Sequence, residues 1–464
     1  MVNILDGLNS MPWVSLGRLP NGWVIELAQI PPRDKFKYSY DLWSNGLAFE
    51  AFGIARTYKA TIRAAGYGDG LWLLNFDTQG RLLNASYTGA RWGPFEISAP
   101  TQDFSLLAYP RYRPEIHRLI GGTWLRAKWI DKYESSHLTY RLEIVEAQDA
   151  LYQAAMRTLD DFVRALSAMN TQQNDPLTER LLDAFRKLPL RTHTELDAEA
   201  ARFHEILGIS GHIPVEPPEL ALDHYHAIPL KVQDGCGGLC TFCSLYGRKI
   251  RIAPVELVFR QIDLMAEYLG EELDHFTKVA LLQGDALVVP PETLARELEY
   301  AREKFALSSS SAFAHAFAKA TTVARAPVPQ LVNLKKRGLL HVNLGLESGC
   351  QDVLNLVKKG QELSEFHGAV SALCEAGIGV SVNIILGVGG LKFKERHVQE
   401  TVEFVRSLPS AVTVFYSPLQ IASTSYYVRN QESSFGRLSD SDMIEQENVF
   451  QRELGAYKYL FVPI

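Results

Sequence analysis

Residues 228–243 read IPLKVQDGCGGLCTFC, an apolar stretch that runs directly into a loop with three cysteines. Ile228–Val232 has the length and composition of a buried strand. Cys236, Cys240 and Cys243 follow in C-x3-C-x2-C spacing, with glycines between them. Glycine lets a backbone bend closely around a bound group. A strand that delivers three thiols to one short loop predicts a metal or cluster site at the end of that strand.

Strand and helix patterns alternate along the rest of this part of the chain. Apolar stretches typical of strands begin near residues 228, 278, 312, 339, 380 and 411, and amphipathic helical patterns separate them. Such alternation is typical of parallel βα units. The pattern therefore predicts an α/β fold, either a βα barrel or a doubly wound sheet.

The first 147 residues have a different pattern. Short apolar or alternating runs at Trp23–Ala28, Leu71–Asp77 and Leu138–Ala147 predict strands of an antiparallel sheet or a small barrel. Helical patterns follow at three places, Ala150–Met169, Leu177–Leu188 and Leu196–Leu207. We therefore expect an N-terminal α+β region that is strand-rich first and helical afterwards.

A proline-rich segment, Gly211–Pro218, has the composition of a linker and places the main boundary near residue 215. The expected organisation is a strand-rich N-terminal domain at 1–147, a helical connector at 148–215, the α/β core at 216–425 and a C-terminal extension at 426–464.

Charge and composition narrow the class of protein. The chain of 464 residues has 47 basic and 53 acidic residues and a net charge of -6, which argues against a nucleic-acid partner. No stretch is apolar over the roughly 18 residues that a membrane helix needs, so we expect no membrane partner. The first residues, MVNILDGLNSMPW, lack the features of a secretory signal. We expect a cytoplasmic protein.

The number of cysteines limits what the loop can bind. A structural zinc site uses four ligands, usually in two pairs, and the other two cysteines, Cys350 and Cys374, are far along the chain. His224 and His226 precede the strand and could complete a zinc site. A [4Fe–4S] cluster normally has four cysteine ligands, so three cysteines would leave one iron open to a small molecule. Both alternatives stand at this point.

The loop resembles the signature of the radical S-adenosylmethionine (SAM) superfamily, with the core found in Elp3, MiaB and NifB and in coproporphyrinogen dehydrogenase. The resemblance covers roughly residues 221–425 and includes the aromatic Phe242 before the third cysteine. It implies a partial (βα)6 TIM-type barrel. It also implies a [4Fe–4S] cluster on Cys236, Cys240 and Cys243, with SAM bound to the open iron.

In this superfamily the cluster donates one electron to SAM, and the 5′-deoxyadenosyl radical that forms abstracts a hydrogen from the substrate. The resemblance therefore implies an enzyme whose partners are a small-molecule or peptide substrate and an electron donor such as flavodoxin or ferredoxin. The sequence does not identify the substrate or the reaction outcome.

Further SAM-binding candidates follow the later strands. Gln283, Gly284 and Asp285 resemble the family's GGE-type motif, although Gln283 and Asp285 depart from it. Residues 341–349, HVNLGLESG, resemble a family segment that contacts SAM through Glu347 and Ser348; Ser348 could equally cap the next helix.

Ends of the last two strands add weaker candidates. Ile385 and Gly387 lie in a glycine-rich segment that resembles the family's adenine-packing stretch, and Gln420 follows the sixth strand. Tyr416 and Cys350 are the candidates for a catalytic role, with packing as the alternative for Tyr416 and a plain helix-start position as the alternative for Cys350. Cys374 and His315 are expected to be ordinary core residues.

Two alternative functions remain open. One is a non-catalytic cluster or haem-binding chaperone that retains the fold. The other is a tRNA-modifying radical SAM enzyme with the N-terminal region as an RNA module, which the net charge of -6 disfavours. Five cysteines do not suffice for a second multi-cysteine cluster beside the loop.

Overall fold

The computed structural model describes residues 14–18, 24–30, 57–63, 71–76, 80–88, 115–118, 124–130, 139–145, 147–168, 185–208, 227–243, 245–270, 273, 278–282, 284–306, 314–409, 412–419 and 435–458. The chain divides into two compact units, residues 1–42 with 48–204 and residues 43–47 with 205–464. Each unit is described by itself. The finer domain boundaries expected from the sequence stay a prediction.

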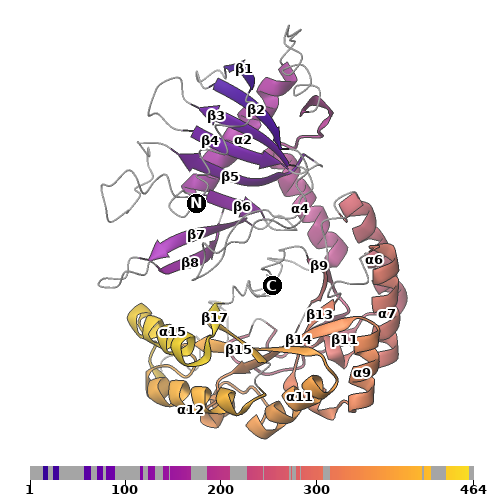
Figure 1. Cartoon of the computed structure of the whole chain (residues 1–464), viewed down its shortest axis with the longest axis vertical. Coiled ribbons are helices and arrows are strands. Elements are labelled where there is room, and N and C mark those ends of the chain that lie inside the picture. The colour runs from indigo at the N-terminus through magenta and orange to yellow at the C-terminus, as the bar shows by residue number, and fades with distance from the viewer. Residues whose placement is uncertain are drawn as a thin grey trace. The chain divides into compact units, whose positions relative to one another are not determined.

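The first unit contains an eight-stranded antiparallel sheet in which each strand pairs with the next one along the chain. Its strands are β1 (Val14–Arg18), β2 (Val24–Ile30), β3 (Thr57–Arg63), β4 (Leu71–Phe76), β5 (Leu82–Thr88), β6 (Glu115–Arg118), β7 (Trp124–Ile130) and β8 (Thr139–Ile144). Figure 1 shows them as one twisted layer. Within the described strands no pairing joins β1 to β8, so the antiparallel alternative of the prediction is found rather than a closed barrel.

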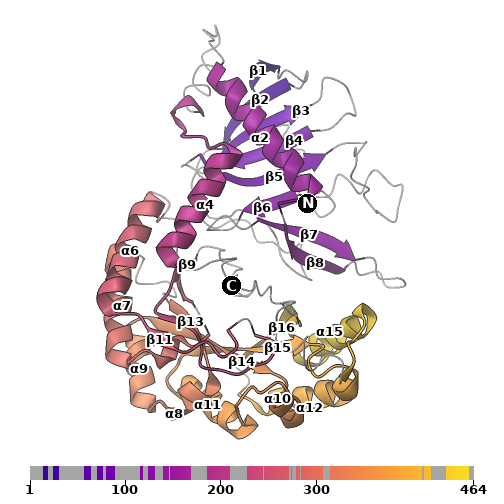
Figure 2. The same cartoon turned by 180° about the vertical axis from the view of Figure 1, so that it is seen from behind.

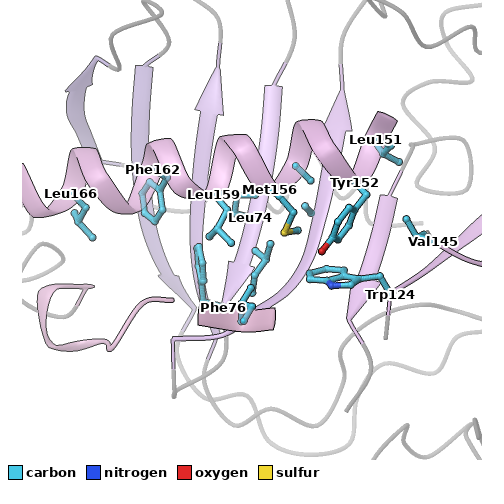
Figure 3. Packing of buried hydrophobic residues seen from close by; sticks show 14 of the residues in the cluster. Leu74, Phe76, Trp124, Val145, Leu151, Tyr152, Met156, Leu159, Phe162 and Leu166 are labelled. Carbon is cyan, nitrogen blue, oxygen red and sulfur yellow. The ribbon is translucent and has the colours of Figure 1, made fainter. Parts of the chain in front are cut away.

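Helix α2 (Ala150–Ala168) crosses one face of this sheet, as Figure 3 shows. Its buried residues recur at helical spacing and include Leu159 and Phe162, both fully buried. The Phe162 ring stacks on Phe76 of β4, with centroids 5.6 Å apart. The apolar stripe read from the sequence is therefore the stripe that the helix buries against the sheet.

A second helix of this unit, α4 (His193–Leu207), follows the short helical stretch 185–187. Most of the helix expected at Leu177–Leu188 lies outside the described residues. Glu199 of α4 forms ion pairs with Arg81 (3.3 Å) and Arg191 (3.0 Å). Arg81 is 5% exposed, so its charge is compensated inside an otherwise apolar core.

The second unit contains a parallel sheet with the order β17-β16-β15-β14-β13-β12-β9. The strands are β9 (Ala227–Leu230), β12 (Lys278–Leu281), β13 (Ala314–Ala318), β14 (Leu339–Glu347), β15 (Gly379–Leu386), β16 (Val412–Pro418) and the two-residue β17 (Tyr457–Lys458). The first six are the strands predicted from the sequence. The short β17, which pairs in parallel with β16, was not predicted.

Helices line the outer side of this curved sheet, which Figures 1 and 2 show from opposite directions. They are α6 (Val255–Leu269), α7 (Pro291–Lys304), α8 (Ala320–Arg325), α9 (Val328–Lys336), α10 (Gln351–Leu356), α11 (Leu363–Glu375), α12 (Lys394–Ser407) and α15 (Asp440–Leu454), with short 3-10 turns η5 (Ala286–Val288) and η6 (Leu391–Phe393). The six parallel strands with their helices are the partial (βα)6 barrel that the sequence predicts. None of the helices in the described part of the chain is long and apolar enough to cross a membrane.

The two faces of the parallel sheet differ in polarity, and β14 shows the difference. Val342, Leu344 and Leu346 are fully buried and apolar, as expected for the face that α9 and α11 cover. His341 and Asn343 alternate with them and point to the opposite face. The helices therefore stabilise one side of the sheet, and the other side carries polar side chains.

Candidate functional site

The cysteine loop lies between two short strands of a hairpin at the end of β9. Strand β10 (Gln233–Asp234) pairs with β11 (Arg251–Ile252) in antiparallel register. Gly235 opens the loop with a φ of +73°, and a Cβ there would lie 2.3 Å from the Lys249 carbonyl oxygen. Only glycine fits this turn without displacing the opposite backbone.

The thiols of Cys236 and Cys240 approach the same point of the loop. A Cβ built on Gly238 would lie 3.4 Å from Cys236 Sγ and 3.7 Å from Cys240 Sγ. Cys243 accepts a hydrogen bond from the Leu245 backbone N–H at 3.4 Å. All three thiols are free, so none is used in a disulfide.

Two of the loop thiols, Cys240 and Cys243, are buried enough to resist ionisation by themselves. Burial raises the pKa of Cys243 to about 11 and also raises the pKa of Cys240. Lys359 opposes the shift at Cys240, and the other thiols add to the shift at Cys243. A coordinated metal deprotonates its thiol ligands outright, so metal binding would overcome the effect of burial on Cys240 and Cys243.

The described donors can be compared with what a single ion and a cluster need. Within the described ranges, no three His, Cys, Asp or Glu side chains gather tightly enough to hold one metal ion. In a cubane each cysteine binds a different iron, so the three thiolates need not converge on one point. His224 and His226, the possible zinc partners, lie outside the described residues.

The segment after β12 touches the cysteine loop. A Cβ on Gly284 would lie 3.0 Å from Cys236 Sγ, so this glycine packs against the first thiol. Asp285 is buried and accepts hydrogen bonds from Lys319 N (3.2 Å) and Thr322 Oγ1 (2.5 Å). Both of its oxygens therefore bind the start of α8, and burial raises its pKa.

Glu347 forms a buried ion pair at the end of β14. Lys359 Nζ lies 2.6 Å from Glu347 Oε1, and each side chain is 11% exposed. Burial favours the neutral amine, yet Glu347 and then Cys240 raise the pKa of Lys359 above its usual value. Glu347 also adopts a φ of +64°, which is uncommon for a residue other than glycine and is often found at functional sites.

Ser348 and Cys350 are bonded within the protein. Ser348 Oγ lies 2.8 Å from His397 Nδ1 and accepts the Cys350 N–H at 3.1 Å. Cys350 is fully buried, and burial raises its pKa. Ser348 thus binds the backbone of Cys350, the residue that precedes α10, and α10 itself has no side-chain cap. Cys350 has the environment of a core residue.

An apolar cluster connects the cysteine loop to the end of β15. Phe242 packs against a group of buried residues that includes Ile385, Val388 and Cys350. Gly387 N donates to Gln446 Oε1 of α15 at 2.9 Å. Phe242 and Ile385 are thus brought together from positions far apart in the sequence.

Tyr416 does not point toward the cysteine loop. Its hydroxyl donates to Glu447 Oε1 at 2.9 Å and accepts from Gln451 Nε2 at 2.6 Å, and both partners belong to α15. The ring is fully buried and shares the β-sheet face of Ile384, its register partner on β15. The residue therefore bonds α15 to the sheet, in line with the packing alternative, and the catalytic role considered for it stays a prediction. Gln283 and Gln420 lie outside the described residues.

Two lysines near the loop were missed by sequence reasoning. Lys359 follows the short helix α10, and Lys319 directly follows β13. The Lys319 Nζ would be 4.0 Å from a Cβ on Gly238. Lys319 could have been found from the sequence, because it follows the carboxyl end of a predicted strand, as the other site candidates do.

His315 differs from the satisfied core histidine that was expected. Its ring stacks on His341, with centroids 5.4 Å apart, but neither ring nitrogen has a hydrogen-bond partner among the described residues. Cys374, in α11, is partly buried, and burial raises its pKa, in agreement with an inert thiol.

Residues 230–405 match the family model described as the Radical SAM superfamily. This match confirms the resemblance drawn from the cysteine spacing. A [4Fe–4S] cluster and SAM are the cofactors of that family.

The chain is also similar to individual proteins. It is 27% identical over 201 residues to the threonylcarbamoyladenosine tRNA methylthiotransferase MtaB of Aquifex aeolicus, covering 39% of this chain and 43% of that protein. It is 28% identical over 192 residues to the tRNA-2-methylthio-N(6)-dimethylallyladenosine synthase of Methylococcus capsulatus, covering 37% and 40%. The chain therefore spans less than half the length of these relatives.

Among solved structures, coproporphyrinogen III oxidase of Escherichia coli aligns with a TM-score of 0.37 and 15% identity, over 49% of this chain and 52% of that one.

Proposed function

We propose that the chain is an enzyme of the Radical SAM superfamily, whose family model residues 230–405 match, and that it cleaves SAM reductively to abstract hydrogen from a substrate. The observation that carries the proposal is the loop in which Cys236 and Cys240 face one point, next to Gly284 from the following strand. Three thiolates and close backbone approach suit a [4Fe–4S] cluster with one open iron.

The cluster with SAM would supply one-electron cleavage of the sulfonium and a carbon-centred radical. The chain would hold the cluster through Cys236, Cys240 and Cys243. Lys359 would place a positive charge beside the thiolates and keep Glu347 in position through their 2.6 Å ion pair. Mutual compensation of these charges allows them to stay buried.

The SAM site is proposed to extend from the loop across the ends of the strands. Phe242 and Ile385 supply an apolar surface suited to a nucleoside ring, and Gly387 permits close approach beside it. Glu347 and Gly284 border the loop from β14 and β12. Asp285 contributes indirectly, because its carboxylate holds α8 and Lys319.

A reductant and an organic substrate complete the proposal. The reaction needs one electron for each SAM cleaved, so a donor protein of the flavodoxin or ferredoxin kind is proposed as a partner. The haem-chaperone alternative is distinguished by experiment, because a non-catalytic carrier would hold a cluster or haem without cleaving SAM.

The experiment is reconstitution of the full chain with iron and sulfide under anaerobic conditions, followed by reduction and assay of 5′-deoxyadenosine. We expect one [4Fe–4S] cluster per chain and SAM cleavage, both lost in the Cys236→Ala, Cys240→Ala, Cys243→Ala triple variant. Cys374→Ala is the matched control and should retain the cluster. Zinc in place of iron, or a cluster that survives in the triple variant, would contradict the proposal.

A second candidate is modification of tRNA, which the names of the two curated relatives favour. Transfer of a methylthio group also needs a sulfur donor, and only Cys350 and Cys374 lie outside the loop. Cys350 is fully buried and bonded into its turn. We therefore rank this candidate second; SAM cleavage that rises on addition of bulk tRNA, with sulfur incorporated into it, would reverse the order.

A further inference from the structure

Buried polar groups without partners occur on the inner face of the parallel sheet. Asn343 is 4% exposed, and neither its amide nitrogen nor its amide oxygen has a hydrogen-bond partner in the described part of the protein. His315 is 8% exposed, and neither of its ring nitrogens has a hydrogen-bond partner among the described residues. Asn383 adds an unpaired Oδ1. These side chains come from three adjacent strands, β13, β14 and β15.

The three residues share one face of the sheet. His315 and His341 are register partners whose rings stack, so both point the same way. Asn343 follows His341 by two residues and therefore projects on that side as well. Asn383 is paired with Gly345, the next residue of β14 on this face.

This face leads to the cysteine loop. Gly345 lies two residues beyond Asn343 on β14. A Cβ built on Gly345 would lie 2.2 Å from Glu347 Oε1 and 2.7 Å from Lys359 Nζ, so the ion pair borders this glycine. The Lys359 charge in turn acts on Cys240. Since two strand residues span roughly 6.6 Å, Asn343 lies about one pleat beneath the ion pair that borders the proposed cluster site.

Unpaired polar groups are unusual in a protein interior, because they lose hydrogen bonds to water without replacement. Packing alone would favour apolar side chains here, as on the opposite face of β14. Several such groups on one face, beside a proposed reaction centre, therefore indicate a ligand that bonds to them.

We propose that Asn343, His315 and Asn383 bind an uncharged cis-amide edge of the substrate, a carbonyl next to an N–H as in a pyrimidinone, a purinone or a cyclic dipeptide. The Asn343 carboxamide both donates and accepts, and so does a neutral imidazole. The Asn383 oxygen accepts a further N–H. The inference rests on the proposed function, because a substrate bound there would lie beneath the radical-generating site.

The charge state of His315 agrees with a neutral ligand. Burial, then Lys278 and His341, lower its pKa well below the usual value, so the ring is uncharged near neutral pH. His341 has a lowered pKa of about 4 and pairs with Ser381 Oγ at 3.0 Å. Recognition on this face therefore depends on hydrogen bonds from neutral imidazoles rather than on imidazolium charge.

The test uses uracil, hypoxanthine and cyclo(Gly-Gly) as probes and the anaerobically purified full chain. Saturation-transfer NMR should detect binding to the wild type, and Asn343→Leu should weaken it at least tenfold. 1,3-Dimethyluracil, which lacks the N–H donors, should not bind. If only uracil and hypoxanthine bind, the substrate's amide edge belongs to a nucleobase. If only cyclo(Gly-Gly) binds, it belongs to a peptide.

Asn355→Leu, at an exposed asparagine of α10, is the matched control and should bind like the wild type. Thermal unfolding gives a second readout, because loss of an unpaired buried amide should leave the melting temperature of Asn343→Leu unchanged or higher. No binding by any probe, or a clear fall in that melting temperature, would overturn the inference. Failure of the proposed function would appear separately, as wild-type protein that takes up no cluster yet still binds the probes.

A second inference comes from the outer surface beside the cysteine loop. Of the five exposed large apolar residues found in the described ranges, four fall between residues 239 and 257: Leu239 (52% exposed), Ile250 (36%), Ile252 (42%) and Leu257 (55%). Leu239 lies between two of the cysteines. Ile250 Cδ1 would lie 3.2 Å from a Cβ on Gly237, so its side chain also borders the loop.

Positive charge accompanies these apolar side chains. Arg248, Lys249 and Arg251 are all exposed, and residues 245–252 contain no acid, although the chain has a net charge of -6. The acidic residues that flank this stretch are Asp234, which pairs with Lys231 at 3.6 Å, and the exposed Glu256. An exposed apolar surface rimmed by basic groups is typical of a protein interface.

We infer that residues 239–257 dock an acidic one-electron donor protein of the flavodoxin class, which again rests on the proposed function. The donor's reduced flavin would lose one electron to the cluster, and that electron would be used in SAM cleavage. Charge complementarity favours an acidic partner, and the position beside the cysteines keeps the transfer path short.

The test is the charge-reversal triple variant Arg248→Glu, Lys249→Glu, Arg251→Glu in the reconstituted enzyme. The rate of 5′-deoxyadenosine formation should fall at least tenfold with reduced flavodoxin as donor but remain near wild type with dithionite. The control, Arg157→Glu, Arg325→Glu, Lys336→Glu, makes the same charge change elsewhere and should retain the flavodoxin rate. Equal losses with both reductants, or no loss with flavodoxin, would overturn the inference; wild-type enzyme inactive with dithionite would instead refute the proposed function.

Discussion

The two sheets of this protein use their faces differently. In the first unit, α2 packs on the antiparallel sheet through apolar residues such as Leu159 and Phe162, and the cluster that they form consists of aliphatic and aromatic residues (Figure 3). In the second unit, helices cover one face of the parallel sheet, while the other face has His315 and Asn343 with unpaired polar atoms. Glu347 and Lys359 form an ion pair at its edge.

The difference separates residues that stabilise from residues that are available for binding. An apolar cluster gains free energy from every group that it buries. A face with unpaired amide and imidazole groups loses free energy until a ligand bonds to them. The second unit can tolerate this cost because its outer face contains large buried residues such as Leu344 and Phe366.

The largest effect is expected from Phe162→Ala in the apolar cluster of the first unit. Phe162 is fully buried and contacts Phe76 and Phe185, so the truncation leaves a cavity and should lower the free energy of unfolding by about 3–5 kcal/mol. Urea unfolding followed by tryptophan fluorescence measures it, because all seven tryptophans lie in residues 1–147. Val163→Ala, at a partly buried neighbour, should cost less than half as much. If Phe162→Ala lost [4Fe–4S] binding to the same extent as it lost folded structure, the proposed difference in role between the two sheets would be contradicted.

Breaking the Glu347–Lys359 ion pair of the second unit should lower the free energy of unfolding by nearly as much. Lys359→Met leaves Glu347 buried without its partner and should cost about 3–5 kcal/mol. The double variant Lys359→Met, Glu347→Gln should recover much of this loss, because the buried charge is then removed as well. Chemical denaturation of four proteins, the wild type, Lys359→Met, Glu347→Gln and the double variant, forms a double-mutant cycle. Additive effects would show that the two side chains do not interact.

A pH dependence is expected from Glu297 of α7, which is 1% exposed and has no hydrogen-bond partner within the described residues. Burial raises its pKa to about 8. The folded state then holds a proton that the unfolded state releases above about pH 4.5, so stability falls as pH rises from about 4.5 to 8. Glu297→Gln should remove this slope and add on the order of 2 kcal/mol at pH 8. Unfolding midpoints of Glu297→Gln measured between pH 5 and 8 check this. If they fall with pH as steeply as those of the wild type, Glu297 is not the source of the pH dependence.

The smallest effect is expected from Tyr416→Phe, which removes the hydroxyl shared by Glu447 and Gln451. The loss should be about 1–2 kcal/mol, measured by thermal unfolding. SAM cleavage should persist, because the hydroxyl bonds to α15 rather than facing the cysteine loop. Abolished cleavage with an unchanged melting temperature would restore the catalytic role considered from the sequence.

Local patterns in the sequence were sufficient to predict the strands and helices of the second unit and the cysteine loop. The alternation of strands and helices from Ile228 to Tyr416 depends on side-chain periodicity, which is set by the backbone and can be read without knowledge of contacts. The C-x3-C-x2-C spacing is equally local. For these reasons the six strands of the partial barrel, and the resemblance that residues 230–405 confirm by matching the Radical SAM family model, followed from the sequence.

Only the tertiary structure decided which polar groups meet. Lys359 reaches Glu347 across a short helix, and Tyr416 bonds to α15, which begins 24 residues later at Asp440. The strand pattern shows that residues such as His315 alternate with apolar ones, but it cannot show whether their hydrogen bonds are satisfied. That depends on which neighbours the strand register and sheet order bring together, and these contacts join parts of the chain that are far apart in sequence.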